Sequence, residues 1–362
     1  MIESIYIHIP FCKKKCLYCD FNSFDNQNEK IEDYMNALCK EAEILVQKYH
    51  ISKLKTIYIG GGTPSFVKAE GIEKLLRILP SAEEVTMEMN PCTVTEEKLQ
   101  IYQKVGVNRV SIGLQTTNNA ILKEIGRAHT FEEFQNAYQM VRKVGFHNVN
   151  VDLMFGLPHQ TLEDLKQSID YLISIQPEHV SCYSLILHRP IFENLPSEEE
   201  ERKMYDYTKE TLQNAGYEHY EISNFAQKGY ESKHNLVYWN QEEYIGMGAG
   251  ASSYVNNERY INEENIDEYI RKMNSQQNIR TIQEVQTIED KVREYMILKL
   301  RLLNGVNFRE ANVIFHFDVK RKFELEISKL FQMGLLEWTA QENLRLTRKG
   351  LDFANVVWRE FI

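Results

Sequence analysis

Three cysteines, Cys12, Cys16 and Cys19, lie within eight residues near the start of the chain. Thiolates are the natural protein ligands of iron–sulfur clusters. Three of them so close together can bind three irons of one cubane cluster and leave the fourth iron open to chelation by a small molecule. The alternatives are a structural zinc site and inert buried thiols. A closed zinc site takes a fourth ligand, and the nearest candidate, His8, lies inside an expected strand.

The segment around these cysteines, YIHIPFCKKKCLYC, resembles the cluster loop of radical S-adenosylmethionine (SAM) proteins. In that family the open iron binds the amino and carboxylate groups of SAM. The string that precedes Cys12 narrows the resemblance to oxygen-independent coproporphyrinogen III oxidase and its relatives. The resemblance therefore implies two cofactors, a 4Fe-4S cluster on the three cysteines and SAM.

The composition favours a globular cytoplasmic protein. The chain has 362 residues, of which 43% are hydrophobic, enough for two or three domains with a sizeable core. We expect no signal peptide, and no apolar run approaches the roughly 20 residues that span a bilayer. The remaining cysteines are scattered, so a disulfide scaffold is not expected, and a reducing compartment suits an oxygen-sensitive cluster. The net charge of −10 argues against nucleic acid as the main partner.

Short apolar strands alternate with amphipathic helices through the first half of the chain. Helical stretches such as 30–48 and 161–175 separate expected strands at 4–9, 56–59, 85–89, 109–114, 149–154 and 180–186. This alternation predicts an α/β fold with parallel strands. Six such units match the partial (β/α)6 TIM-type barrel of the radical SAM family. In barrels of this type the active site lies at the carboxyl ends of the strands.

A glycine-rich loop, residues 60–64 (GGGTP), directly follows the second expected strand. Consecutive glycines let the backbone approach a ligand closely, although an ordinary flexible turn is the alternative. The resemblance implies that Gly61, Gly62 and Thr63 hold the methionine end of SAM. It also makes Tyr6 and Tyr18, which flank the cluster cysteines, candidates for packing against SAM, and Tyr6 fits the strand core equally well.

Polar residues also lie near the ends of the third, fourth and fifth expected strands. Charged side chains inside apolar strands are costly to bury unless they are paired. One alternative is therefore that Glu88 and Asp152 form internal salt bridges with Arg109 or Arg127. The resemblance instead implies contacts with SAM: both carboxylates accept hydrogen bonds from its amino or ribose hydroxyl groups, and Arg127 pairs with its carboxylate. Gln115, at the end of the fourth strand, joins this expected site.

The string HNLVYW begins at His234, beyond the expected barrel. Histidine is a common axial ligand of heme iron, and aromatic side chains can stack on a porphyrin. A packed or hydrogen-bonded histidine is the alternative. The string resembles the H-N-x-x-Y-W motif of HemW-type heme chaperones, in which the histidine is the expected heme-iron ligand. His219 and His188 are the next candidates.

The last part of the chain predicts helices at 290–303, 308–315 and 320–333, then a hairpin and a final helix. This order favours a small winged-helix-like α+β domain of the kind that the oxidase family carries at its carboxyl end. Its third helix has mixed charge, which favours a cover or an interaction surface over DNA binding. We therefore expect a radical SAM barrel over 1–228, a connecting region with the heme motif over 229–287, and this domain over 288–362.

Two functions remain to be separated. One is an enzyme, the coproporphyrinogen oxidase of porphyrin biosynthesis, and the other is a chaperone that binds heme and transfers it to hemoproteins. In the oxidases a fourth cysteine follows two residues after the third, and here that residue is Phe21. Phe21 and the His234 motif both favour the chaperone, with heme-accepting proteins as partners and transient contact with membrane hemoproteins left open. A radical SAM enzyme with another substrate stays open as well.

Overall fold

The computed structural model describes residues 2–362, and residue 1 of the expected barrel lies outside them. Its main sheet has nine strands in the order β7-β8-β6-β5-β4-β3-β2-β1-β9. Neighbours from β1 to β6 are parallel, which confirms the six expected units. The six strands are β1 (Ser4–Ile9), β2 (Leu54–Gly61), β3 (Ala82–Met89), β4 (Arg109–Gln115), β5 (Val149–Phe155) and β6 (His179–Ser184).

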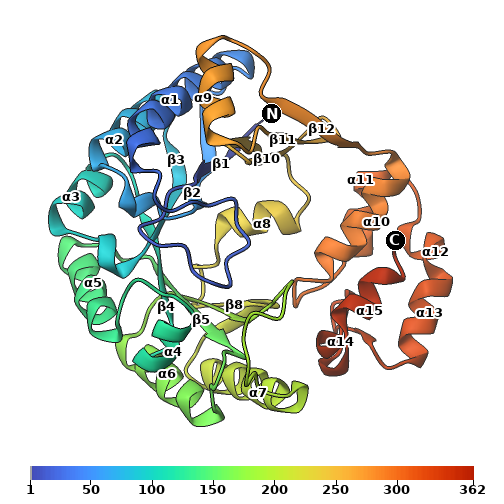
Figure 1. The fold of residues 1–362 in the computed structure, drawn as a ribbon. Coiled ribbons are helices and arrows are strands. Elements are labelled where there is room, and N and C mark those ends of the chain that lie inside the picture. Colours follow the sequence, from blue (N-terminus) through green and yellow to red (C-terminus); the bar gives the residue numbers. More distant parts are fainter. Residues whose placement is uncertain (1) are drawn as a thin grey trace.

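Helices cover the outer face of this curved sheet (Figure 1). They are α1 (Ile31–Lys48), α2 (Ala69–Ile78), α3 (Glu96–Lys104), α4 (Asn119–Glu124), α5 (Phe131–Val144), α6 (Leu162–Ile175) and α7 (Glu198–Asn214). Both α5 and α6 begin with a capping box, in which a threonine and the acid three residues later satisfy free backbone amides. All seven residues of β4 are buried, as expected for a parallel strand covered on both faces.

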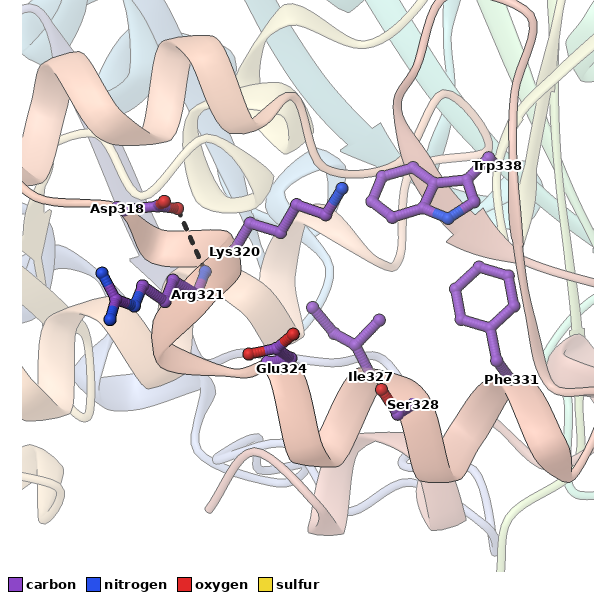
Figure 2. A pocket seen from close by; sticks show the side chains of 8 residues that line it. All are labelled: Asp318, Lys320, Arg321, Glu324, Ile327, Ser328, Phe331 and Trp338. Carbon is purple, nitrogen blue, oxygen red and sulfur yellow. Dashed lines mark hydrogen bonds between the residues drawn. The ribbon is translucent and has the colours of Figure 1, made fainter.

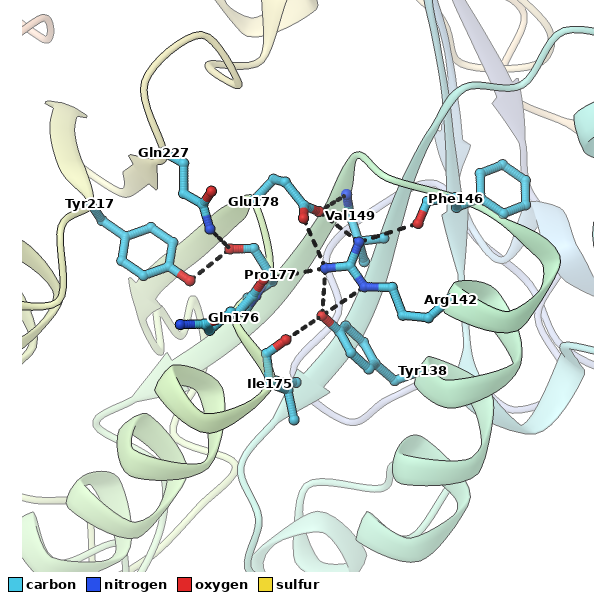
Figure 3. Close-up of polar contacts among 10 residues, drawn as sticks. All are labelled: Tyr138, Arg142, Phe146, Val149, Ile175, Gln176, Pro177, Glu178, Tyr217 and Gln227. Carbon is cyan, nitrogen blue, oxygen red and sulfur yellow. Dashed lines mark hydrogen bonds and ion pairs between the residues drawn. The ribbon is translucent and has the colours of Figure 1, made fainter.

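A polar network ties α5 to the amino ends of β5 and β6 (Figure 3). The Arg142 guanidinium forms an ion pair with Glu178 at 2.8 Å and donates to the Tyr138 hydroxyl at 2.7 Å. Glu178 also accepts from the backbone amide of Val149, the first residue of β5, at 3.0 Å. These contacts hold the end of the barrel opposite to the cysteine loop.

The sheet continues past the six parallel strands on both sides. The short strands β7 (Glu218–Glu221) and β8 (Asn224–Ala226) form an antiparallel extension beside β6. On the other edge β9 (Ile245–Met247) pairs parallel with β1. The glycine-rich segment around β9 therefore forms one edge of the sheet. Gly246 has no room for a side chain, because a Cβ there would clash with the Ser252 carbonyl oxygen.

Between the sheet and the carboxyl-terminal part lie α8 (Lys233–Trp239), the antiparallel strands β10 (Ser252–Val255), β11 (Glu258–Asn262) and β12 (Arg280–Val285), and α9 (Ile266–Asn274). Helix α8 contacts β2 on one side and α10 on the other. The core of the barrel includes residues of this region up to Ile279. The motif that begins at His234 thus lies on a helix packed between barrel and carboxyl-terminal module.

The carboxyl-terminal module has its own hydrophobic core, from Val292 to Phe361, and lies to one side of the barrel (Figure 1). It contains α10 (Ile288–Lys299), α11 (Phe308–Phe315), α12 (Val319–Lys322), α13 (Glu324–Gln332), the hairpin β13 (Leu336–Trp338) and β14 (Leu344–Leu346), α14 (Arg348–Asp352) and α15 (Ala354–Arg359). The helix expected over 320–333 is divided into two helices at Phe323. The expected final helix is likewise divided into α14 and α15 at Phe353, and the remaining order of helices and hairpin is the expected one.

The module carries a hollow of about 690 Å³ between α12, α13 and the hairpin (Figure 2). Trp338 stacks on Phe331 with ring centroids 5.8 Å apart, and the Lys320 ammonium lies 4.5 Å from the Trp338 ring. Two acids, Asp318 and Glu324, line the same hollow as Lys320 and Arg321. The lining is therefore balanced in charge and does not form the basic face that nucleic-acid binding needs.

Candidate functional site

A cavity of about 330 Å³ opens at the carboxyl ends of the parallel strands, where a barrel of this type carries its site. It brings together residues from strands β2 to β6 and from the cysteine loop. Among its lining residues are eleven that the sequence predicted for the cluster and SAM: Cys12, Cys16, Tyr18, Cys19, Gly61, Gly62, Thr63, Glu88, Gln115, Arg127 and Asp152. Eleven of the twelve predicted residues thus lie on one cavity, although they span 141 positions of sequence.

The cysteine loop is fixed to the barrel by backbone hydrogen bonds. The Cys12 amide donates to the Phe24 carbonyl at 2.9 Å, and the Leu17 amide donates to the Ile125 carbonyl at 3.1 Å. The Lys15 ammonium donates to the carbonyls of Phe21 and Ser23, at 3.1 and 2.9 Å. Lys15 therefore has a structural role, because it joins two parts of the cysteine loop.

Each of the three sulfurs has a polar side chain beside it. The Thr63 hydroxyl donates to Cys12 Sγ at 3.6 Å, and Arg127 Nη1 donates to Cys16 Sγ at 3.5 Å. Cys19 Sγ lies 3.6 Å from the Ser23 hydroxyl. Hydrogen bonds to the sulfurs of an iron–sulfur cluster tune its reduction potential. The donors come from the glycine-rich loop after β2, from the segment after α4 and from the cysteine loop itself, so the barrel supports the whole triplet.

The arrangement of the three thiols fits a multi-iron cluster better than a single zinc ion. Within residues 2–362, no three His, Cys, Asp or Glu side chains converge closely enough to hold one metal ion. A cubane cluster takes each thiolate on a different iron, so its ligands need not converge on one point. The thiols also border a cavity that extends toward the strand ends, which leaves room beside them for a chelating ligand.

The glycine loop is needed for packing as much as for access. Gly61 has a φ of +105°, and a Cβ there would lie 2.4 Å from the His8 ring. A Cβ at Gly62 would lie 2.7 Å from the Ile9 carbonyl oxygen and 2.9 Å from the Phe11 amide nitrogen. The clash expected from a side chain at these positions is thus with β1 and the start of the cysteine loop, not only with a ligand.

Glu88 holds the glycine loop from the neighbouring strand. Its carboxylate accepts from the Tyr58 hydroxyl at 2.8 Å and from the Gly61 amide at 3.1 Å. Burial raises the pKa of Glu88 to about 7, although the hydrogen bond from Tyr58 opposes this shift. A buried carboxylate that titrates near neutrality, beside a cavity, marks a candidate ligand-binding group.

The alternative of internal salt bridges is wrong for both acids. Asp152 accepts from Asn150 Nδ2 at 2.7 Å and from the Ser111 hydroxyl at 3.3 Å, and burial raises its pKa. Within the described part of the chain neither Asp152 nor Glu88 forms an ion pair within 4.0 Å, although the charge of Arg109 opposes the rise in both pKa values. Arg127 instead donates to Cys16, Tyr18 and the Gly113 carbonyl, and its buried Nε has no partner.

Tyr6 is the predicted SAM residue that lies away from the cavity lining. Its hydroxyl bonds to His8 Nδ1 at 2.9 Å, and its ring stacks on Tyr58 with centroids 6.3 Å apart. Tyr6 therefore lies in the barrel interior, which agrees with the alternative that it is a core residue of its strand. Tyr18 does line the cavity, and packs against a small apolar cluster around Ile125 and Leu185.

Comparisons with known proteins agree with this geometry. The radical SAM superfamily model matches residues 6–172, and the HemN C-terminal domain model matches residues 286–353. The chain is 37% identical to the heme chaperone HemW of Lactococcus lactis, over 99% of this chain and 97% of the relative. It is 38% identical to the heme chaperone HemW of Bacillus subtilis, over 100% and 99%. The chain belongs to the HemW family of radical SAM proteins.

A solved structure agrees on the fold of this HemW-family chain. Coproporphyrinogen III oxidase (HemN) from Escherichia coli matches with a TM-score of 0.86, covering 99% of this chain and 90% of that one, at 21% identity. That likeness concerns the fold alone, barrel and carboxyl-terminal domain together. Among residues 2–362, no helix is both long and apolar enough to cross a membrane.

The HemW-family motif histidine, His234, is enclosed in the structure. It is 1% exposed, its Nδ1 bonds to the Thr56 hydroxyl at 2.8 Å, and its Nε2 bonds to the Tyr238 hydroxyl at 2.8 Å. Its ring stacks on Tyr58 with centroids 5.1 Å apart, and burial lowers its pKa to about 3. Both ring nitrogens are thus engaged. Ligation of heme iron by His234 stays a prediction, and it requires one of these bonds to open.

The cavity also contains residues that sequence reasoning missed. They are mostly small polar side chains and one tyrosine, and they include Asn90, Ser111, Ser181, Tyr183 and Asn224. The Tyr183 hydroxyl donates to Gln115 Oε1 at 3.3 Å, which orients a predicted residue. The sequence did contain one signal for Ser181 and Tyr183. They are alternate residues of β6 near its carboxyl end, where the site was expected.

Proposed function

We propose that this chain is a heme chaperone that binds heme and transfers it to recipient hemoproteins. The observation that carries the proposal is sequence identity of 37% and 38% to two heme chaperones named HemW, over 99% and 100% of this chain. Alignments of this length include both the radical SAM region and the carboxyl-terminal domain. The proposed partners are heme-accepting proteins, the proposed compartment is the cytoplasm, and nucleic acid is not among the partners. The division into 1–228, 229–287 and 288–362 stays a prediction.

We further propose that Cys12, Cys16 and Cys19 hold a 4Fe-4S cluster. A cluster held there by three thiolates would leave one iron open to the amino and carboxylate groups of SAM. The cavity beside the thiols contains Glu88 and Asp152 to accept hydrogen bonds from SAM, and Arg127 to pair with its carboxylate. The unpartnered Arg127 Nε and the raised pKa of Glu88 support a polar ligand in this place.

The oxidase alternative is disfavoured by Phe21. Its side chain lines the cavity and is 67% exposed, where the oxidases have a fourth cysteine. A phenyl ring supplies neither a thiolate nor a proton. We therefore expect no useful conversion of coproporphyrinogen to protoporphyrinogen, whether or not the chain retains the capacity to cleave SAM.

One set of measurements tests these proposals. The chain is purified and reconstituted anaerobically, its iron and sulfide are counted, and heme binding, heme transfer to an apo-hemoprotein and coproporphyrinogen turnover are measured in parallel. We expect one four-iron cluster, one heme per chain, transfer and no turnover. Turnover with SAM and a reductant would overturn the chaperone proposal. Full iron and sulfide in a variant with all three cysteines replaced by alanine would overturn the cluster assignment.

A further inference from the structure

The accessible histidines decide where heme iron can bind first. Five of the ten histidines are buried, at 9% exposure or less: His8, His129, His179, His219 and His234. His219 stacks on Phe225 with centroids 4.3 Å apart, and its Nε2 bonds to a carbonyl, so this candidate is enclosed as well. An iron porphyrin is large, so it reaches an exposed imidazole without rearrangement of the fold, whereas a buried imidazole must first be uncovered. The remaining five histidines are exposed.

Position separates the exposed histidines. His50 and His147 lie just before β2 and β5, at the end of the barrel away from the cavity, and His316 lies in the carboxyl-terminal module. Two remain on the cavity side. His159 follows β5 and borders a separate hollow that contains no cysteine. His188 follows β6, and its Nε2 lies 3.4 Å from Asp20, the residue between Cys19 and Phe21.

The surroundings of His188 match the chemistry of heme. Phe21, which lines the cavity, is 67% exposed, and Ile186, two residues before His188, is 71% exposed, so both leave apolar surface in water. Lys14, which lines the cavity, and Arg189, which follows His188, are exposed cations. Heme presents an apolar plane, an iron that imidazole binds, and two carboxylates that pair with such cations.

Asp20 is placed to orient the His188 ring for metal binding. Metal-binding histidines commonly give their second ring nitrogen to a carboxylate, which orients the ring and raises its basicity. The contact between His188 Nε2 and Asp20 has this form, and the His188 side chain is 73% exposed. By contrast, His234 has both nitrogens bonded to hydroxyl groups inside the protein.

We propose that heme docks at the mouth of the cysteine cavity, with His188 as an iron ligand and Phe21 against the porphyrin face. This inference rests on the proposed function, since it places the heme that a chaperone carries. It gives Phe21 a positive role in the place of the oxidase cysteine. A ligand on an exposed segment also suits a carrier, because bound heme stays accessible to a recipient and can be released.

Heme titration of the cluster-bearing chain tests this site, with hemin as the ligand and the Soret band as the readout. We expect His188→Ala to weaken heme binding about tenfold or more and to change the Soret band. His188→Met should keep binding but shift the band, because a thioether replaces the imidazole. Phe21→Ser should weaken binding and leave the band position unchanged. Iron and sulfide are counted in each variant to verify that the cluster is intact.

His159→Ala is the matched control. His159 is exposed on the same side of the barrel and also faces a carboxylate, Glu124, at 3.6 Å, but it lies away from the cysteines. We expect it to bind heme like the parent. If His188→Ala keeps the parent's affinity and Soret band, the proposed site is wrong while heme carriage stands. If the parent itself binds no heme, the proposed function fails.

Discussion

Replacement of His234 by alanine should destabilise the barrel whether or not His234 binds heme. The substitution leaves the Thr56 hydroxyl without its partner at a position with 0% exposure, and also frees the half-buried Tyr238 hydroxyl. An unsatisfied buried polar group costs about 1–3 kcal/mol, and the lost ring stacking on Tyr58 adds up to about 1 kcal/mol. We expect the free energy of unfolding to fall by about 3 kcal/mol.

Anaerobic urea unfolding, followed by far-UV circular dichroism, measures this loss. His188→Ala serves as the control, because its exposed side chain should contribute less than about 0.5 kcal/mol. A loss below about 1 kcal/mol in His234→Ala would refute the view that the imidazole is a structural link between β2 and α8. A loss of the expected size means that reduced heme binding in this variant is not by itself evidence of ligation.

The pH dependence gives a second measure of the same histidine. The pKa of His234 is lowered to about 3, chiefly by burial and also by the charge of Arg109, from 6.5 in the unfolded chain. Its contribution to stability is therefore present above pH 6.5 and is lost as the pH falls from 6.5 toward 3, by at most about 1.4 kcal/mol per pH unit. His234→Gln should reduce this slope by one proton, and an unchanged slope would contradict the burial.

Tyr238→Phe separates ligation from structure, because it frees His234 Nε2 without removing the imidazole. If His234 binds heme iron, this variant should bind heme more tightly than the parent; with His188 as the ligand, affinity should be unchanged. Gly62→Val should lower both SAM affinity and cluster content, because its side chain meets backbone at Ile9; iron and sulfide equal to the parent's would contradict this. The pKa of about 7 at Glu88 predicts SAM affinity that rises between pH 6 and 8, because ionisation improves the carboxylate as an acceptor, and Glu88→Gln should flatten this rise in a binding titration. Arg142→Met should lower the free energy of unfolding by about 2 kcal/mol and leave SAM affinity unchanged, because it breaks a half-buried ion pair far from the cavity.

Much of the site was predictable because its residues lie at or near the carboxyl ends of parallel strands, and the sequence predicts where those strands end. Glu88 lies in β3 and Asp152 in β5, two parallel strands separated by β4, and a resemblance in short motifs was enough to assign them to one cavity. The sequence could not tell Tyr6 from Tyr18, since both flank the cysteines. The difference arises from strand register: Tyr6 pairs with Tyr58 in β2 and points to the interior, whereas Tyr18 lies in the loop.

The state of His234 was not predictable, because it depends on contacts across 178 positions of sequence. A motif of histidine, tyrosine and tryptophan describes a helix face equally well whether that face binds a porphyrin or a neighbouring strand. The edge strand β9 was missed for a similar reason. Three residues within a glycine-rich segment carry little strand signal, and only pairing with β1 makes them a strand.

The two candidate heme ligands differ in what heme binding would do to the rest of the molecule. Helix α8 is attached to β2 through His234, and to the carboxyl-terminal module through Trp239, whose ring lies 4.3 Å from the Arg301 guanidinium, and through Asn240, which accepts from Lys299 at 2.6 Å. Because His234 is 1% exposed and its ring stacks on Tyr58 of β2, heme iron reaches either ring nitrogen only if α8 moves away from β2, the strand that ends in the glycine loop. Such binding has to change SAM affinity, and SAM must change heme affinity by the same factor. Heme on His188 leaves β2 and α8 in place, but it lies at the mouth of the cavity proposed for SAM, so there the two affinities are coupled by direct contact and the coupling should depend on Phe21. Measuring heme affinity with and without SAM, in the parent and in Phe21→Ser, therefore distinguishes the sites: coupling through β2 should persist in the variant, and coupling by direct contact should weaken.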